Sequence, residues 1–372
     1  MTLPLGSRPQ RCGDLLTLVC QVPCGACHNL LELTKSGWTW TNQAIVADPR
    51  DRNGQNGAVY QTSISVVVVS YCTRELLAAC LRSLSEAREV IVVDNASSDG
   101  SAEMVRAEFP HVVLIEAGRN VGFGAACNLG AAAATQEIVL FLNSDATALP
   151  GSLRILESVF SDPGVVAAGG RLQFPDGKVQ ASCCAELTLW RVFCEQTLLE
   201  KLLPMSRFFN GYWLTRWLPS NEPSLVAQVM GACLAVRRGS EPFDNDFFLY
   251  VEDTELCKRL SVKGSIVYEP RAIFSHELGA STSNRRWWSV AMYNRGKEMY
   301  FAKHHGKTAA GICFAFNRLG AFLRLLIAIL QLGRGGKIQL FWRVLVAPAS
   351  GPPLPDDSSP FPLERETSTL VK

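Results

Sequence analysis

The hydrophobic positions of this chain form short apolar runs that alternate with segments of helical spacing. Residues 63–70 are apolar and β-branched, a composition typical of a buried parallel strand. Similar runs at 90–93, 112–115 and 138–142 predict three more strands. Between the strands, three- and four-residue apolar spacing predicts helices near 76–84, 102–108 and 124–134. This alternation predicts an α/β domain with a largely parallel sheet.

Three apolar runs end in carboxylates. These are Asp94 after residues 90–93, Asp145 after residues 138–142, and Glu252 and Asp253 after residues 247–251, a run that also predicts a strand. Open α/β sheets bind ligands at the carboxyl ends of their strands. We therefore expect a nucleotide, a metal ion and a general base to meet along one edge of the sheet.

The two ends of the chain do not follow this pattern. Residues 1–62 contain clusters of Gly, Pro, Asn and Asp without periodicity, which predicts a poorly ordered extension. Within it, Cys20, Cys24, Cys27 and His28 have a spacing that matches c-type haem attachment and could also hold zinc, with chance clustering as the alternative. Residues 350–372 are rich in Pro and Ser and predict a disordered tail.

Residues 307–349 are apolar but carry polar side chains. Arg318 and Arg324 disfavour a helix that spans a bilayer, so the region predicts amphipathic helices on a membrane surface, with buried soluble helices as the alternative. Residues 285–343 contain eleven Lys and Arg against one acid, Glu298. This basic character, mixed with Trp and Leu, suits an anionic membrane better than a nucleic acid.

Composition limits the class of protein. With 372 residues, 48% hydrophobic and 19% charged, the chain can bury a large core and is not a largely disordered protein. The net charge of +2 gives no overall field that would attract nucleic acid. Thirteen cysteines, an odd number spread through apolar runs, fit reduced thiols. No convincing signal peptide opens the sequence, so we expect a cytoplasmic location.

Each candidate on the nucleotide side has a structural alternative. Asp94 suits a ribose hydroxyl or a base N–H, but it could equally cap the polar turn at 95–101. Residues 118–130 form a glycine-rich entry to a helix, which suits a phosphate or close packing of helix on sheet. They do not form a dinucleotide fingerprint, because Cys127 stands where its third glycine belongs.

The other candidates also have two interpretations. The triplet at 143–145 suits Mg²⁺ or Mn²⁺ completed by a diphosphate, or it caps a turn after a strand. Glu252 and Asp253 suit a general base and its partner, or they are acids favoured at the start of a helix. His276 is a metal ligand or a structural histidine.

Taken together, the motifs resemble the family 2 glycosyltransferases, in particular bacterial rhamnosyltransferases and related enzymes of cell-surface polysaccharide synthesis. The resemblance runs from about residue 63 to residue 306. It rests on six ordered motifs, at residues 67–71, 92–101, 119–124, 141–146, 243–253, and His276 with Gly279.

The resemblance implies a GT-A fold, in which a Rossmann-like nucleotide-binding sheet joins a mixed acceptor-side half, followed here by C-terminal amphipathic helices. It implies a metal-dependent, inverting sugar transfer. We expect dTDP-rhamnose as donor and a saccharide or lipid-linked acceptor, with UDP-hexose and UDP-galactofuranose as alternative donors. The implied site comprises Asp253 as base with Glu252 beside it, Asp145 and His276 as ligands of Mg²⁺ or Mn²⁺, and Ser70, Tyr71, Asp94, Asn95, Asp99, Asn120, Asn128 and Asn143 around the donor.

The chain departs from the family pattern in four places. Cys72 stands where asparagine is usual, Ser144 replaces a usual proline, the segment at 237–243 is shorter, and residues 1–62 have no counterpart. A methyltransferase or dehydrogenase is the alternative of another class, but the glycine-rich loop it needs after the first strand is missing from residues 70–74. A catalytically silent, saccharide-binding paralogue is a third hypothesis, and the retention of all three strand-end aspartates argues against it.

Overall fold

The computed structural model describes residues 17–18, 29–34, 37–42, 61–277, 286–331 and 335–352. The chain divides into two compact units, 1–58 and 59–372. In the first unit, β1 (Thr17–Leu18), β2 (Asn29–Thr34) and β3 (Gly37–Asn42) form an antiparallel sheet in that order, in a segment where the sequence predicted no element. The cysteine cluster with His28, and Gly279 of the histidine motif, lie outside the described residues.

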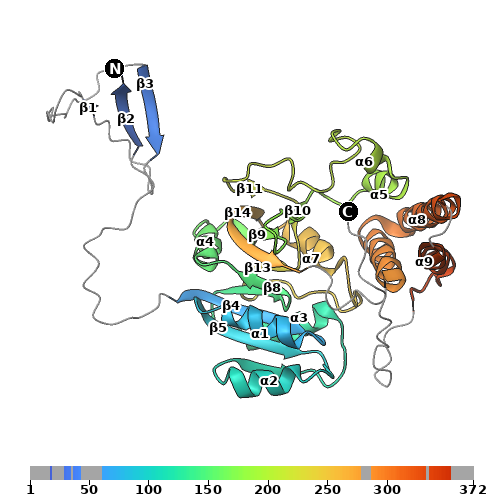
Figure 1. Cartoon of the computed structure of the whole chain (residues 1–372), viewed down its shortest axis with the longest axis horizontal. Helices are drawn as coiled ribbons and strands as arrows, with labels where there is room; N and C mark the ends of the chain where they lie inside the picture. Colours follow the sequence, from blue (N-terminus) through green and yellow to red (C-terminus); the bar gives the residue numbers. More distant parts are fainter. Residues whose placement is uncertain are drawn as a thin grey trace. The chain divides into compact units, whose positions relative to one another are not determined.

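The second unit is a mixed α/β domain followed by helices (Figure 1). Its elements are β4 (Thr62–Ser70), α1 (Arg74–Arg82), β5 (Ala87–Asp94), α2 (Ser101–Glu108), β6 (Val113–Glu116), α3 (Phe123–Ala133), β7 (Ile138–Asn143), β8 (Ala146–Ala148), α4 (Ser152–Val159), β9 (Val165–Gln173), β10 (Cys183–Cys184), α5 (Leu189–Gln196), α6 (Leu199–Leu202), β11 (Ser224–Leu225), β12 (Gln228–Val229), β13 (Cys233–Arg237), α7 (Glu252–Leu260), β14 (Ser265–His276), α8 (Arg286–Leu330) and α9 (Gly335–Val346).

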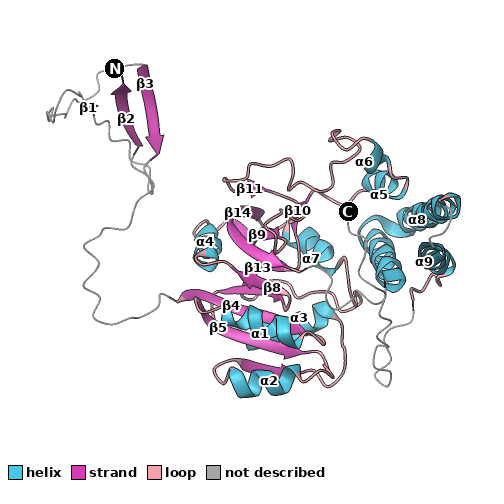
Figure 2. Ribbon diagram, in the orientation of Figure 1, coloured by secondary structure: helices cyan, strands magenta, loops and turns pink. Residues whose placement is uncertain are grey.

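The main sheet has the order β11-β14-β9-β13-β7-β4-β5-β6, with β8 paired to β14 (Figure 2). Strands β7, β4, β5 and β6 run parallel to one another, as the apolar runs predicted. Strand β13 runs antiparallel between β7 and β9, while β14 is parallel to β9 and antiparallel to β8. The predicted division into a parallel nucleotide-side half and a mixed half is confirmed.

Both faces of the parallel half are buried. Val66 and Val68 of β4 pack with residues of α1, α2 and α4 such as Leu77. Val67 and its neighbours on the other face pack with α3 and α7. Because successive side chains of a strand point to opposite faces, four consecutive valines fill two layers of core.

The predicted strand at 247–251 is wrong, because these residues form turns that lead into α7. Phe247 and Val251 are nevertheless buried, and they pack against Tyr300 and Phe301 of α8. A short apolar run does not distinguish a buried strand from a turn that packs against helices.

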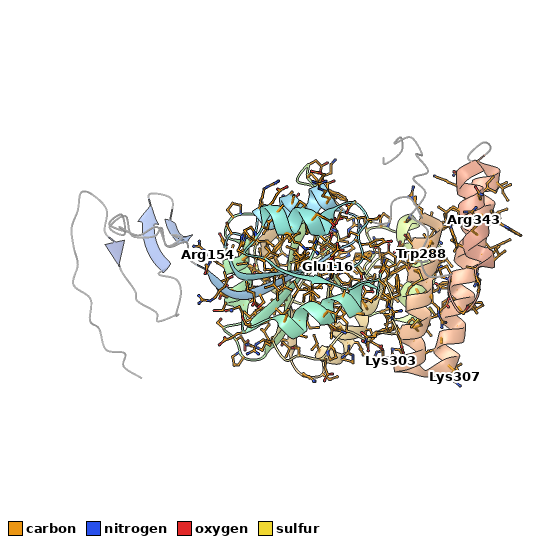
Figure 3. All side chains as sticks on the ribbon, turned by 90° about the horizontal axis from the view of Figure 1, so that it is seen from below. Glu116, Arg154, Trp288, Lys303, Lys307 and Arg343 are labelled. Carbon is orange, nitrogen blue, oxygen red and sulfur yellow. The ribbon has the colours of Figure 1, made fainter. Side chains whose placement is uncertain are left out.

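Helix α8 is a hairpin of two helices. Gly306 has φ 85° and ψ 171°, which breaks the helix. The side-chain nitrogen of Asn317, Nδ2, donates to the carbonyl oxygen of Asn294 at 3.2 Å and to Glu298 Oε1 at 2.9 Å. Because these residues lie on either side of the break at Gly306, the two halves pack antiparallel. Figure 3 shows Lys303 and Lys307 together at the end where the chain reverses.

Arg318 and Arg324, the two arginines that disfavour a spanning helix, form hydrogen bonds within the protein. Arg318 donates to the carbonyl oxygens of Val344, Leu345 and Ala347 at the end of α9. Arg324 donates to the carbonyl oxygens of residues 195, 196 and 320, two of them at the end of α5. Cations are favourable at helix C-termini, where carbonyl groups lack partners within the helix.

Candidate active site

The carboxyl ends of three parallel strands place the predicted donor-side residues along one edge. Ser70 lies opposite Asp94 on the neighbouring strand, and Val69 lies opposite Asn143 on the other side. Ser70 is fully buried, and Tyr71, which follows it, is half-buried.

Asp94 has the features of a ligand-binding carboxylate. Its Oδ2 accepts a hydrogen bond from the Ser97 N–H at 2.9 Å, which is the capping contact that the sequence left open. Its Oδ1 is buried and has no hydrogen-bond partner among the residues that the structure describes. Because a buried carboxylate oxygen is costly to leave unpaired, this atom suits a donor group of a ligand, such as a hydroxyl or a base N–H.

Asn95 and Asn120 shape the glycine-rich loop. Asn95 Nδ2 donates to Asn120 Oδ1 at 2.8 Å, and Asn95 Oδ1 accepts from the Val121 N–H at 2.9 Å. Asn120 Oδ1 also accepts from the Gly122 N–H at 3.1 Å. Their side-chain carbonyl oxygens therefore hold backbone, so these residues position the loop.

Two further predicted donor residues are also engaged with backbone. Asp99 accepts hydrogen bonds from the N–H groups of Arg74 and Ser101, at the starts of α1 and α2. Asn128 donates to the carbonyl oxygen of Phe243 and accepts from its N–H, which fastens residues 243–245 to α3. Both side chains thus stabilise the loops that border the site.

Asn143, Asp145 and His276 form the candidate metal site. His276 Nε2 lies 3.2 Å from Asp145 Oδ1 and 3.3 Å from Asn143 Nδ2. Strand β14 brings the histidine here, because His276 pairs with Ala146. Within the described ranges, no three His, Cys, Asp or Glu side chains gather closely enough to hold a metal by themselves.

The hydrogen bonds of Gln180 fix the tautomer of His276. Gln180 Nε2 donates to the carbonyl oxygen of His276 at 2.5 Å, so its Oε1 accepts from the imidazole Nδ1–H at 2.9 Å. In the neutral imidazole, Nε2 then carries a lone pair that faces a carboxylate oxygen. This arrangement fits a cation between the two side chains, with Gln180 as the outer partner that orients the ligand.

Ser144 is also explained by the structure. Its hydroxyl accepts a hydrogen bond at 2.8 Å from Thr73 Oγ1, which lies 3.3 Å from Ser70 Oγ. A buried chain of hydroxyl groups therefore ties the 143–145 turn to the end of β4. This contact restrains the turn at the position where the resemblance led us to expect a proline.

Asp253 is held at the start of α7. Its Oδ2 accepts from the Gly231 N–H at 2.8 Å, and its Oδ1 accepts from the Thr254 N–H at 2.7 Å. The next residue along, Ala232, accepts a hydrogen bond from the Asn143 N–H at 3.2 Å. Residues 231–232 thus connect the predicted base directly to the predicted metal turn.

The turn before α7 is strained. Tyr250 and Val251 have φ values of 69° and 70°, a left-handed conformation that is unfavourable for any residue with a Cβ and most unfavourable for a β-branched one. Consecutive strained residues next to a chemically active group are typical of functional sites. Here the two left-handed residues immediately precede Glu252 and Asp253, the first residues of α7.

The first two acids of α7, Glu252 and Asp253, differ in their surroundings. Burial, followed by the charge of Asp253, raises the pKa of Glu252 well above its usual value. Burial also raises the pKa of Asp253, but hydrogen bonds from Gly231 and Thr254 oppose that rise. Glu252 Oε2 has no partner within the described part of the chain. The surroundings therefore favour the ionised form of Asp253 over that of Glu252.

Sequence reasoning missed Thr73, Gln180 and Gly231. Gln180 and Gly231 lie 96 and 22 residues from the side chains they contact. No local motif marks them, so only the fold reveals their role. Cys72, by contrast, is a position that the family pattern had already marked, because asparagine is usual there. Its φ of 54° is left-handed, and asparagine adopts this conformation more readily than most residues.

Substituting Gly122 with alanine is expected to destabilise the protein by about 3 kcal/mol. A Cβ at Gly122, where φ is 89°, would overlap the carbonyl oxygen of Phe248 and lie 3.0 Å from its ring. Gly118→Ala is the matched control, because φ is 73° but no described atom lies within 4 Å of its Cβ, so about 1 kcal/mol is expected. Urea denaturation would measure both, and equal losses would contradict the close-contact argument.

Comparison with known proteins identifies the family of the chain. Residues 65–216 match the model of Glycosyl transferase family 2. The chain is 30% identical over 263 residues to N-acetylglucosaminyl-diphospho-decaprenol L-rhamnosyltransferase of Mycobacterium tuberculosis, covering 65% of this chain and 85% of that protein. It is 26% identical over 276 residues to the pre-mycofactocin glycosyltransferase of M. tuberculosis, covering 72% of this chain and 52% of that one.

Among solved structures, a mannosyltransferase from Pyrobaculum calidifontis in complex with GDP-Man and Mn²⁺ is similar, with a TM-score of 0.45 and 18% identity, covering 78% of this chain and 86% of the other. The TarS fragment 1–349 from S. aureus gives a TM-score of 0.43 and 15% identity, covering 76% and 81%. The extent of the match to the mycobacterial rhamnosyltransferase establishes the family. The chain, with its GT-A sheet, is therefore a glycosyltransferase that belongs to glycosyltransferase family 2.

Proposed function

We propose that this chain transfers L-rhamnose from dTDP-rhamnose, with inversion, to a saccharide or lipid-linked acceptor in cell-surface polysaccharide synthesis. The sugar and the acceptor type follow the name of the mycobacterial relative, which is a rhamnosyltransferase for a decaprenyl diphosphate-linked sugar. The observation that carries the chemistry is the connection from Asp145 and Asn143 through residues 231–232 to Asp253.

The residues take the following roles in this proposal. Asp94 binds the nucleoside of the donor through its unpaired Oδ1, and the loop shaped by Asn95 and Asn120 lies beside the diphosphate. Asp145 and His276 would hold Mg²⁺ or Mn²⁺ jointly with the diphosphate, and the ion would stabilise negative charge on the leaving group.

Asp253 is the general base. It takes the proton of an acceptor hydroxyl while that oxygen bonds to the anomeric carbon and the bond from this carbon to the diphosphate oxygen breaks. The leaving nucleoside diphosphate needs no protein acid, so one ionised carboxylate is sufficient. A single displacement inverts the anomeric centre, whereas retention would need an enzyme nucleophile.

The location follows from the acceptor. A lipid-linked acceptor requires the enzyme at a membrane, and we place it on the cytoplasmic face, where the nucleotide sugar is available. In the described residues, one helix, Arg286–Leu330, is long and apolar enough to cross a membrane by length and composition. Because Gly306 folds this helix back on itself, we favour surface attachment through the C-terminal helices.

The donor is tested by thermal shifts with dTDP, UDP and GDP, each with and without Mn²⁺. We expect stabilisation by dTDP with Mn²⁺, of about 2.7 kcal/mol at 100 times the dissociation constant. A shift with UDP alone would favour a UDP-hexose or UDP-galactofuranose donor and contradict the rhamnose assignment. A dTDP shift that does not depend on the metal would contradict the proposed role of the ion.

A further inference from the structure

From residue 311 to residue 330, every residue that α8 exposes is apolar. Between residues 311 and 330, the exposed residues are Gly311, Ile312, Ala315, Leu319, Phe322, Leu326, Ile327, Ile329 and Leu330. The polar residues Asn317, Arg318 and Arg324 are bonded inside the protein instead. A helix on a water-facing surface has the opposite polarity, with its polar side outward.

A second apolar element follows α5. In the segment 201–208, Leu202, Met205 and Phe208 are 72%, 74% and 66% exposed. The same segment exposes Lys201 and Arg207, and the sequence contains no acid from 201 to 221. Large apolar side chains that are exposed together mark an interaction site, and the local charge is positive.

A row of aromatic rings joins the two elements. The ring centroid of Phe316 on α8 lies 5.2 Å from that of Phe193 on α5, and the ring centroids of Phe193 and Trp190 are 5.6 Å apart. Trp190 in turn lies 4.8 Å from Phe208. These rings link the outer side of residues 311–330 to the segment 201–208, and we call the two elements together the docking surface.

The segment 201–208 is also fastened to the catalytic centre. The carbonyl oxygen of Tyr212 accepts from the Ala185 N–H at 2.8 Å, next to β10. Strand β10 pairs with β12, and the chain then reaches Gly231, whose N–H binds Asp253. Backbone hydrogen bonds thus connect the chain just after residue 208 to the strands that lead to Gly231 and Asp253.

We propose that the docking surface binds an anionic lipid bilayer, with residues 201–208 inserted at the interface beside α8. Apolar side chains, interfacial tryptophan and cations without acids are the chemistry that such a surface recognises. The consequence for catalysis rests on the proposed function: the backbone connection to Asp253 then brings the head group of a membrane-anchored acceptor to the base.

The test is co-sedimentation of the full chain with phosphatidylcholine vesicles, with and without phosphatidylglycerol. We expect the wild type to bind the vesicles that contain phosphatidylglycerol, and Met205→Glu with Phe208→Glu to lower the partition coefficient at least about tenfold. Val262→Glu is the matched control, because Val262 is 83% exposed in the turn between α7 and β14, outside the docking surface, and it should bind as the wild type does.

A second variant tests the charge. Lys201→Gln with Arg207→Gln should reduce binding to the anionic vesicles and leave any binding to pure phosphatidylcholine unchanged. Nucleotide-dependent thermal shifts of each variant report that the fold and donor site remain intact. The two proposals are therefore tested separately. A wild type that shows no thermal shift with any nucleotide would refute the transferase assignment, whereas vesicle binding does not depend on nucleotide binding.

Three outcomes would overturn the bilayer proposal. The first is a wild type that stays in the supernatant with both kinds of vesicle. The second is a glutamate variant that binds as strongly as the wild type. The third is a wild type that light scattering shows to be a dimer and a glutamate variant that is a monomer, since the surface would then join two copies of this chain.

Discussion

Asp253→Asn is expected to lower kcat for sugar transfer by roughly 10³-fold while the dissociation constant of the donor stays unchanged. Asparagine keeps the size of the side chain but cannot take a proton from the acceptor hydroxyl. Asp253 touches Gly231 and Thr254, not the strand ends proposed for the donor, so donor binding should survive. Steady-state kinetics and calorimetry with the nucleotide would measure the two quantities.

The pH profile supplies a second readout. Burial raises the pKa of Asp253, and the base works only when ionised, so kcat/KM should rise with pH through that elevated pKa and then level. The residual activity of Asp253→Asn should lack this rise. Equal rates in variant and wild type, or a rise that persists in the variant, would remove Asp253 from its proposed role.

Asp145→Asn is expected to weaken donor binding in the presence of Mn²⁺ at least about 100-fold. The charge that attracts the ion is lost, and His276 alone is a neutral ligand. Binding measured in EDTA should be the same for variant and wild type, because only the metal-dependent part is removed. Titration calorimetry with the nucleotide would show both.

Asp176→Asn is the matched control for this experiment. Asp176 lies in an exposed turn, where its carboxylate pairs with Lys178 at 2.6 Å. This variant should retain the full effect of Mn²⁺. If Asp145→Asn also retains it, the candidate metal site is wrong.

The strand-end residues were predictable because their position follows from local pattern alone. Each apolar run is followed by a carboxylate, and parallel strands end at the same edge of the sheet. Asp94 and the 143–145 turn therefore lie on the two sides of the end of β4. The same argument failed at 247–251. That run is as apolar as a strand, but it packs against the side chains of Tyr300 and Phe301 and does not pair with any strand that the structure describes. These two residues lie about 50 positions later in the sequence, so no local pattern reveals the contact.

The roles of Arg318 and Arg324 could not be predicted for a similar reason. When only the sequence is known, each charged arginine on a helix is assumed to need contact with water. In the folded chain, the partners are carbonyl oxygens at the ends of two other helices, and these become known only when α5 and α9 are placed. The cost of a charge depends on such contacts more than on its neighbours in sequence.

The contact between α8 and the strained turn limits how far this enzyme can be shortened. A Cβ at Gly296 would lie 2.8 Å from the carbonyl oxygen of Tyr250 and 2.9 Å from a methyl group of Val251, so the helix backbone presses directly on the two left-handed residues. Every proposed catalytic side chain precedes residue 277, yet a fragment that ends there would lose this restraint. We therefore expect the smallest fragment that holds Asp253 in place to extend through the first half of α8.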